Sequence, residues 1–232
     1  MKYEHLFFDL DHTLWDFEAN SKEALLELYA SYDWQSDLGV EVEDFLSKYY
    51  QVNDQMWALY RVGKITKADL RHRRFMESLG SFGVVDEEKV KSFEKDYIDL
   101  APRKTELFPG CLSMLDQLKN HFDLHIITNG FHETQHIKLR ESRLKPYFKQ
   151  IITSDQVGVN KPAAGIFIEA MKAAKANRKN SLMIGDNLMV DILGARNVGM
   201  DQVYFNPHKE AHQQQVTIEI HHLKELPLAL GI

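Results

Sequence analysis

Two aspartates stand two positions apart at the end of an apolar run near the N-terminus. The stretch Phe-Phe-Asp-Leu-Asp-His-Thr, residues 7–13, leads from a hydrophobic segment directly into Asp9 and Asp11. Like charges this close repel one another and are costly to bury, so a divalent cation is the usual way to stabilise them. Residues two apart on an extended chain point to the same side. The pair is therefore spaced to flank one reacting atom.

Polar side chains with complementary chemistry follow three later apolar runs. The segments concerned hold Thr128 and Asn129, Lys161 in front of a proline, and Asp186 with Asp191 one helical turn further on. In open parallel sheets, ligands bind beyond the carboxyl ends of the strands. We therefore expect these side chains to converge with the first two aspartates on a single crevice.

The combined set of groups suits phosphoryl chemistry. Oxygen ligands from carboxylates favour a hard ion such as Mg²⁺. A carboxylate beside the metal can attack phosphorus and form an aspartyl-phosphate, and a second carboxylate can protonate the leaving oxygen. Lys161 and Thr128 supply donors for phosphate oxygens as charge develops. The spacing of Asp9 and Asp11 is then that of two groups flanking one phosphorus.

The elements that must position these residues form an alternating pattern. Short apolar runs read as strands buried on both faces, and they are separated by stretches with helical periodicity. The expected strands are 5–9, 124–128, 150–153, 182–184 and 202–205, the expected helices are 111–119, 133–141, 164–176 and 190–197, and an edge strand and final helix are expected within 217–230. Strand alternating with helix predicts parallel βαβ units. The fold class is α/β, with a Rossmann-like, three-layer, parallel-sheet core.

The pattern changes between the first strand and about residue 100. Apolar residues there recur at helical spacing, no convincing strand is present, and about four helices are expected. Asn20 and Glu23 are spaced as a capping box for the first of them. We therefore predict two domains, a Rossmann-like core of residues 1–15 and 101–232 and an all-helical domain of residues 16–100 inserted after the first strand.

Composition restricts the classes of partner. The 232 residues carry a net charge of −6, which gives no basic surface for nucleic acid and favours a small substrate over a polyanionic macromolecule. A single cysteine allows no intrachain disulfide, and no apolar run is long enough to span a bilayer. The sequence predicts a cytoplasmic protein, a monomer or homodimer, that acts on a small phosphorylated metabolite without nucleic acid or membrane partners.

These motifs resemble the four ordered motifs of the haloacid dehalogenase-like (HAD) hydrolases. The matching segments contain Asp9-Leu-Asp11-His-Thr, Thr128-Asn-Gly, Lys161-Pro and Gly-Asp186 with Asp191. The resemblance implies Asp9 as nucleophile, Asp11 as general acid/base, and Thr128, Asn129 and Lys161 as phosphate binders. It further implies Mg²⁺ held by Asp9, the Asp11 carbonyl and Asp186, with Asp191 supporting. Members that cleave carbon–halogen bonds lack the second aspartate, so its presence here favours a phosphatase.

The resemblance also implies that the core is a phosphatase core and that the helical domain of residues 16–100 is a cap, and a finer resemblance lies in this cap. The pattern around Trp57 and Tyr60, together with Phe131 after the Thr-Asn-Gly loop, looks like the pyrimidine 5′-nucleotidase branch of the family. Aromatic side chains there could stack on a base. These three residues are therefore candidates for substrate contacts, although for Trp57 and Tyr60 the helical spacing favours a hydrophobic seam over contact with substrate.

Several other functions use parts of the same pattern. A sugar-phosphate phosphatase or a phosphoglucomutase of the same superfamily would keep all four motifs. A phospho-acceptor receiver module also clusters aspartates, a threonine and Lys-Pro on a parallel sheet, but its acidic pair precedes the lysine and it has no insert of about 85 residues. The stretch His132-Glu-Thr-Gln-His136 matches the H-E-x-x-H pattern of zinc proteases.

Overall fold

The chain folds into two compact units. The computed structural model describes residues 2–232, except for the side chains of residues 37 and 38. One unit contains the chain up to Phe17 and from Thr105 onward, and the other is Glu18–Lys104. The second unit was expected at 16–100; in the structure it begins at Glu18 and extends to Lys104, because the 3₁₀ turn Ala101–Arg103 continues directly from its last helix. Each unit is described separately below.

The first unit is built on a parallel sheet. Within the described residues the sheet has six strands in the order β3-β2-β1-β4-β5-β6, and every neighbouring pair is parallel. The strands are β1 (His5–Phe8), β2 (Asp123–Thr128), β3 (Gln150–Thr153), β4 (Ser181–Gly185), β5 (Asp201–Phe205) and β6 (Ile218–Ile220). β1 therefore lies between β2 and β4, where the strand order reverses. This topological switch point is the usual ligand position in such sheets.

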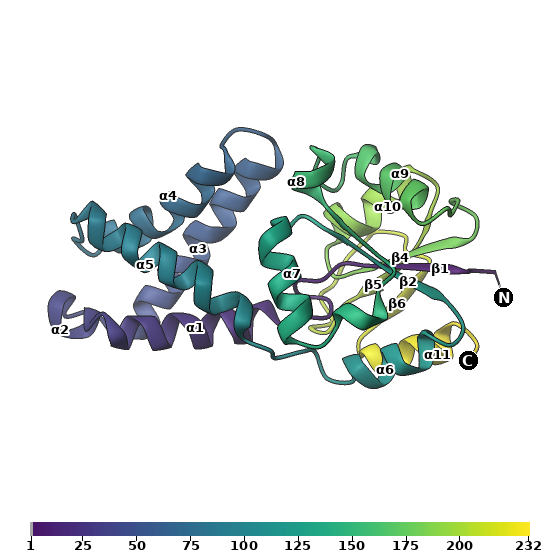
Figure 1. Cartoon of the computed structure of the whole chain (residues 1–232), viewed down its shortest axis with the longest axis horizontal. Helices are drawn as coiled ribbons and strands as arrows, with labels where there is room; N and C mark the ends of the chain where they lie inside the picture. Colours follow the sequence, from purple (N-terminus) through teal and green to yellow (C-terminus); the bar gives the residue numbers. More distant parts are fainter. Residues whose placement is uncertain (1) are drawn as a thin grey trace. The chain divides into compact units, whose positions relative to one another are not determined.

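Alternate side chains of each strand belong to two different hydrophobic layers, which makes the core three-layered. Phe8, Ile126 and Ile184 are buried in one cluster with residues of three helices, α6 (Cys111–Leu118), α7 (His132–Glu141) and α11 (Leu226–Ala229). Phe7 and Met183 are buried in another cluster with residues of α9 (Ala164–Ala173) and α10 (Leu193–Asn197). Successive side chains of a strand point to opposite faces, so a strand covered on both sides must be apolar throughout. Figure 1 shows α6 and α11 on one side of the sheet and α9 and α10 on the other.

The helices of this unit lie close to their expected positions. They are α6 (Cys111–Leu118), α7 (His132–Glu141), α8 (Ser154–Val157), α9 (Ala164–Ala173), α10 (Leu193–Asn197) and α11 (Leu226–Ala229). The helix expected at 190–197 begins earlier and differently, as a π-helix at Leu188–Ile192 that runs into α10. The α/β prediction, with its helical insertion after the first strand, is confirmed.

The second unit is all helical in its described part. Its helices are α1 (Phe17–Ser31), α2 (Trp34–Leu38), α3 (Val42–Arg61), α4 (Lys67–Gly80) and α5 (Glu87–Leu100), with the first residue of α1 belonging to the sheet unit. The extra helix relative to the expected four is the five-residue α2, bounded by the left-handed residues Asp33 and Gly39. An aromatic core that includes Phe45, Phe75 and Phe93 holds the helices together.

One helix start was predicted wrongly. Asn20 is fully buried inside α1, which already begins at Phe17, so Asn20 and Glu23 do not form a capping box. The capping box of this unit lies at Thr66 and Asp69, where each side chain accepts a hydrogen bond from the other residue's backbone N–H. Asn20 is a helix-interior residue because the tertiary packing of α1 buries it, which a local capping pattern does not show.

The two connections between the units pair with each other inside the sheet unit. Trp15 forms an antiparallel bridge with Leu107, and the Asp16 N–H donates to the Glu106 carbonyl at 3.1 Å. The segments that leave and re-enter the sheet are thus held side by side. In neither unit does a described helix combine the length and the apolar character needed to cross a bilayer.

Candidate active site

The first strand delivers Asp9 to the carboxyl edge of the sheet. The Asp9 N–H donates to the Ile184 carbonyl at 2.9 Å, so the strand's pairing with β4 continues one residue beyond β1. The chain then closes a tight loop, in which the Trp15 N–H donates to the Leu10 carbonyl at 2.9 Å and His12 has a φ of 64°. This loop fixes the backbone of Asp9 and Asp11 against the rigid sheet, which is how a functional site is kept precise.

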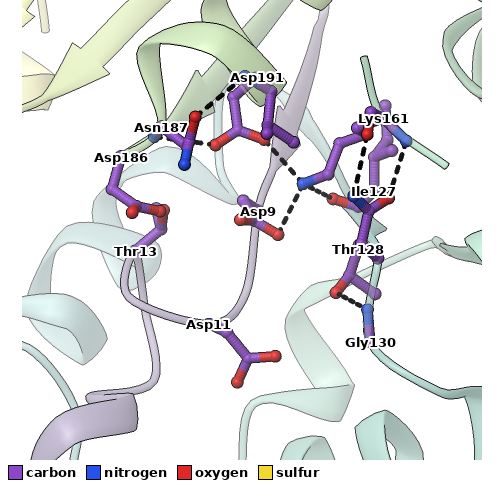
Figure 2. Close-up of polar contacts among 12 residues, drawn as sticks. Asp9, Asp11, Thr13, Ile127, Thr128, Gly130, Lys161, Asp186, Asn187 and Asp191 are labelled. Atoms are coloured by element: carbon purple, nitrogen blue, oxygen red, sulfur yellow. Dashed lines mark hydrogen bonds and ion pairs between the residues drawn. The ribbon is translucent and has the colours of Figure 1, made fainter. Parts of the chain in front are cut away.

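Lys161 links the nucleophile candidate to the end of β4. Its ammonium lies 2.8 Å from Asp9 Oδ1 and 2.7 Å from Asp191 Oδ1, and it donates to the Ile127 carbonyl at 2.9 Å. Figure 2 shows these three contacts radiating from the Lys161 nitrogen. Lys161 is only 1% exposed, so its positive charge is available only inside the site. Burial opposes the charged form, but Asp191 and Asp9 outweigh it and raise the pKa of Lys161.

Asn129 fixes the backbone that carries this lysine. Its Oδ1 accepts the Lys161 N–H at 2.7 Å and its Nδ2 donates to the Lys161 carbonyl at 3.0 Å. Both ends of the amide are therefore used to hold the loop. The prediction that Asn129 binds phosphate stays a prediction, and its side chain in this structure contacts Lys161 instead.

The end of β4 supplies two more carboxylates. Asp191 is fully buried, and its Oδ2 accepts the Asn187 N–H at 3.1 Å. The π-helix between them turns Asp191 back toward the strand end, and Gly185 leaves the space that this needs, because a Cβ there would lie 2.4 Å from Asp191 Oδ2. Asp186 accepts a hydrogen bond from the Thr13 hydroxyl at 2.9 Å.

Three of the carboxylates form a candidate cation site. Ligand oxygens of Asp9, Asp186 and Asp191 lie within 4.8 Å of one another, and no other group of three His, Cys, Asp or Glu side chains in the described residues meets this criterion. Burial raises the pKa of Asp9 well above its usual range, Asp191 and Asp186 add to the rise, and Lys161 opposes it. Burial, with the Asp191 charge, also raises the pKa of Asp186 to about 7. An all-oxygen set with this excess of negative charge fits a hard divalent cation.

Asp11 is held separately from this cluster. Its Oδ2 accepts a hydrogen bond from Gln135 Nε2 at 2.9 Å, and its Oδ1 forms an ion pair with Lys138. Burial alone would raise the pKa of Asp11, but the Lys138 charge and the hydrogen bonds from Lys138 and Gln135 lower it. The Asp11 carboxyl group is therefore held beside the candidate cation site and not within it.

Thr128 and Phe131 complete the loop after β2. The Thr128 hydroxyl is buried and accepts the Gly130 N–H at 3.0 Å, which leaves its own hydrogen available for donation. Phe131 is 5% exposed and precedes the first residue of α7. In the helical unit, Trp57 and Tyr60 are partly buried on α3 and pack edge to face with ring centroids 5.7 Å apart. Contacts of these aromatic residues with substrate stay predictions.

The zinc-protease pattern does not assemble a metal site. The rings of His132 and His136 pack against each other with centroids 4.2 Å apart, and the backbone N–H of His132 donates to both carboxylate oxygens of Asp155. No third ligand joins the two histidines within the described residues. The pattern instead forms the first part of α7, which packs on the sheet.

Sequence reasoning missed Thr13, Gln135 and Lys138. Thr13 stood inside the first motif, but nothing in its spacing assigned it to Asp186. Gln135 and Lys138 lie three apart on α7 and so share a helix face, next to the buried Leu139. The sequence signal that could have identified them was the presence of two polar residues on the inward face of the helix that follows the Thr-Asn-Gly loop.

The chain belongs to the haloacid dehalogenase-like hydrolases. The model of that family matches residues 3–199, which span both the sheet unit's motifs and the helical insertion. This membership decides against a receiver-like module, since the match is to a family of hydrolases.

Several relatives match nearly the whole chain. The chain is 35% identical to pyrimidine 5′-nucleotidase PynA of Streptococcus pneumoniae, over 97% of this chain and 94% of PynA. It is 33% identical to pyrimidine 5′-nucleotidase YjjG of Escherichia coli, over 93% of this chain and 90% of YjjG. A magnesium-bound crystal structure of the protein YfnB of Bacillus subtilis matches over 100% of both chains at 30% identity, with a TM-score of 0.89.

Proposed function

We propose that this protein is a phosphoric monoester hydrolase that works through an aspartyl-phosphate on Asp9. The observation that carries the proposal is the arrangement at the switch point, where Lys161 joins Asp9 to Asp191. An Asp9 oxygen attacks phosphorus, the bond from phosphorus to the ester oxygen breaks, and the ester oxygen leaves with the proton of Asp11, which enters this step in its protonated form. Asp11 then takes a proton from water, which attacks the aspartyl-phosphate, releases inorganic phosphate and restores Asp9.

Lys161 and Thr128 hold the phosphoryl oxygens in this proposal. Three acceptors surround the Lys161 ammonium, and one of them is Asp9 itself. When Asp9 carries the phosphoryl group, its contact with Lys161 passes to a phosphoryl oxygen, so the buried charge meets the negative charge that develops in the reaction. The Thr128 hydroxyl donates from the neighbouring strand end.

Mg²⁺ is the cation that the proposal assigns to the site. Asp9, Asp186 and the Asp11 carbonyl would hold it, with Asp191 in support, and the close grouping of the Asp9, Asp186 and Asp191 oxygens fits such an ion. When bound, the ion neutralises charge on the transferring phosphoryl group. Mg²⁺ binding is measured directly by calorimetry, and Asp186→Asn weakens it; activity is expected to stop with EDTA and to return with Mg²⁺.

A matched pair of aspartate variants tests the chemical proposal. Asp9→Asn removes the nucleophile and is expected to abolish phosphate release with the fold intact. Asp116→Asn changes an exposed aspartate of α6 that pairs with Lys119, and it is expected to keep wild-type activity. Phosphate release by Asp9→Asn at the wild-type rate would refute the assignment of the nucleophile.

We further propose that the substrates are small pyrimidine nucleoside 5′-monophosphates. The similarity to PynA and YjjG along nearly the whole chain supports this choice. Trp57 and Tyr60 are partly buried aromatic side chains, a type of side chain on which a base can stack. The test is a panel of nucleoside monophosphates, deoxynucleotides and hexose phosphates. If UMP and dTMP rank no higher than hexose phosphates, the nucleotidase assignment is wrong while the phosphatase assignment survives.

A further inference from the structure

The carboxylate of Asp11 is held by two buried side chains of one helix. Gln135 donates to Oδ2 at 2.9 Å and Lys138 pairs with Oδ1, so each carboxylate oxygen has its own donor. Gln135 is 1% exposed and Lys138 is 5% exposed. In Figure 2 the Asp11 carboxylate points away from Asp9. The orientation of the Asp11 carboxylate is thus set by α7 and not by the three carboxylates of the candidate cation site.

The surroundings are shaped to fit these two side chains. A Cβ at Gly130 would lie 1.7 Å from Gln135 Nε2, so the glycine of the Thr-Asn-Gly loop makes the room that Gln135 occupies. The Lys138 ammonium lies over the Trp15 ring, 3.9 Å from its centroid, and Trp15 belongs to the same loop as Asp11. The first motif, the second motif and α7 are therefore packed together around Asp11.

Stability does not explain why these positions are polar. The Oε1 of Gln135 is buried and has no hydrogen-bond partner among the described residues, which is unfavourable by comparison with an apolar side chain of the same size. Burying an ion pair such as Lys138 with Asp11 is also often no more stable than packing apolar groups there. The presence of both polar residues is better explained by the contacts through which they hold the Asp11 carboxylate.

We propose that Gln135 and Lys138 are positioning residues that orient Asp11 toward the leaving group and the attacking water. The proposal rests on the function assigned above, in which Asp11 transfers the proton. Each oxygen of a carboxylate has a second lone pair, so Asp11 can hold a proton while keeping both contacts to α7. Without them the carboxylate rotates freely about its side-chain bonds, and the fraction of productive orientations falls.

The loss of kcat/KM on substrates with different leaving groups distinguishes the loss of Asp11 positioning from a general disturbance of the structure. An alkoxide leaving group needs a proton from Asp11, whereas p-nitrophenolate leaves readily without one. Lys138→Met keeps the length of the side chain and removes its charge; Gln135→Met keeps the volume and removes the donor. For each variant, kcat/KM is measured with the best alkyl phosphate of the substrate panel and with p-nitrophenyl phosphate.

We expect Lys138→Met to lower kcat/KM for the alkyl phosphate by roughly 10- to 100-fold and for p-nitrophenyl phosphate by less than about threefold, with Gln135→Met changing the ratio in the same direction. Lys104→Met, which removes a lysine paired with Glu23 and Glu27 in the helical unit, should leave the ratio unchanged. Circular dichroism checks that each variant is folded, and Gln135→Met decides the matter if Lys138→Met does not fold.

Two results would overturn the proposal. An equal loss on both substrates, or no loss at all, would show that Gln135 and Lys138 do not act through proton transfer by Asp11, and the phosphatase assignment would stand. If the wild-type protein hydrolyses neither substrate, the assigned function fails and the positioning role fails with it.

Discussion

Replacing Lys161 with methionine should destabilise the protein strongly, because it removes the buried charge that faces Asp9 and Asp191. Methionine keeps most of the aliphatic stem, so the loss is mainly electrostatic. Lys161 is 1% exposed and lies 2.7 Å from Asp191, whose side chain is fully buried. Removing one partner of a buried pair costs about 3–5 kcal/mol. For a chain of this size that corresponds to a fall in Tm of roughly 6–20 °C.

A matched variant in the helical unit isolates the effect of burial. Lys104 also contacts two carboxylates, at 2.8 Å each, but these belong to Glu23 and Glu27, which are 63% and 57% exposed. Exposed pairs contribute about 1 kcal/mol or less, so Lys104→Met should lower Tm by only a few degrees. The same substitution at the same distances thus gives two very different results.

Thermal and urea unfolding of both variants, with EDTA and with Mg²⁺, provide the measurement. We expect Mg²⁺ to raise the Tm of Lys161→Met by more than that of wild type, because a bound cation supplies part of the missing positive charge. The reasoning is refuted if, in EDTA, Lys161→Met unfolds within about 1 kcal/mol of Lys104→Met.

Three further predictions concern other buried groups. Burial, with the neighbouring His5, lowers the pKa of His125 to about 4, so the unfolded chain binds its proton first. The stability that neutral His125 contributes is complete above about pH 6.5 and falls by up to about 3 kcal/mol as the pH drops toward 4. The free energy of unfolding, measured with urea at each pH, should fall less steeply with decreasing pH for His125→Gln than for wild type. Gly185→Ala should weaken Mg²⁺ binding in calorimetry by displacing Asp191, whereas Gly80→Ala, with no atom within 4 Å of the new Cβ, should not. Burial raises the pKa of the Cys111 thiol to about 12, so a thiol reagent at neutral pH should label it only after denaturation.

The sequence sufficed to predict the sheet because its strands are apolar on both faces. Runs such as 124–128 and 182–184 do not alternate regularly between apolar and polar residues. Only a strand that is covered by helices on both faces needs apolar residues at successive positions. Once the strands are parallel, the residues after them must meet at one edge. That is why Asp9, Lys161 and Asp191, which lie far apart in the chain, could be assigned to one place before the structure was known.

Contacts that depend on the direction of a side chain could not be predicted from the sequence. The pairing of Lys138 with Asp11 depends on the rotation of α7 about its axis and on the loop that closes at Trp15. Neither is encoded in motif spacing. The π-helix that turns Asp191 inward was likewise missed, because π-helices occur mostly as single turns inside α-helices and the spacing around Asp191 was interpreted as α-helical. The capping box predicted at Asn20 was wrong for a similar reason, because tertiary packing buries Asn20 inside the helix and overrides the local capping pattern.

The pairing of the two connectors makes the helical unit an exchangeable module. Because Trp15 bridges Leu107 and Asp16 bonds Glu106, the chain ends left by removing Glu18–Lys104 are already neighbours. A short turn could join them, and a different helical segment could be grafted there, without altering any strand of the sheet. The helical segment could then be exchanged between chains while the groups at the strand ends are retained.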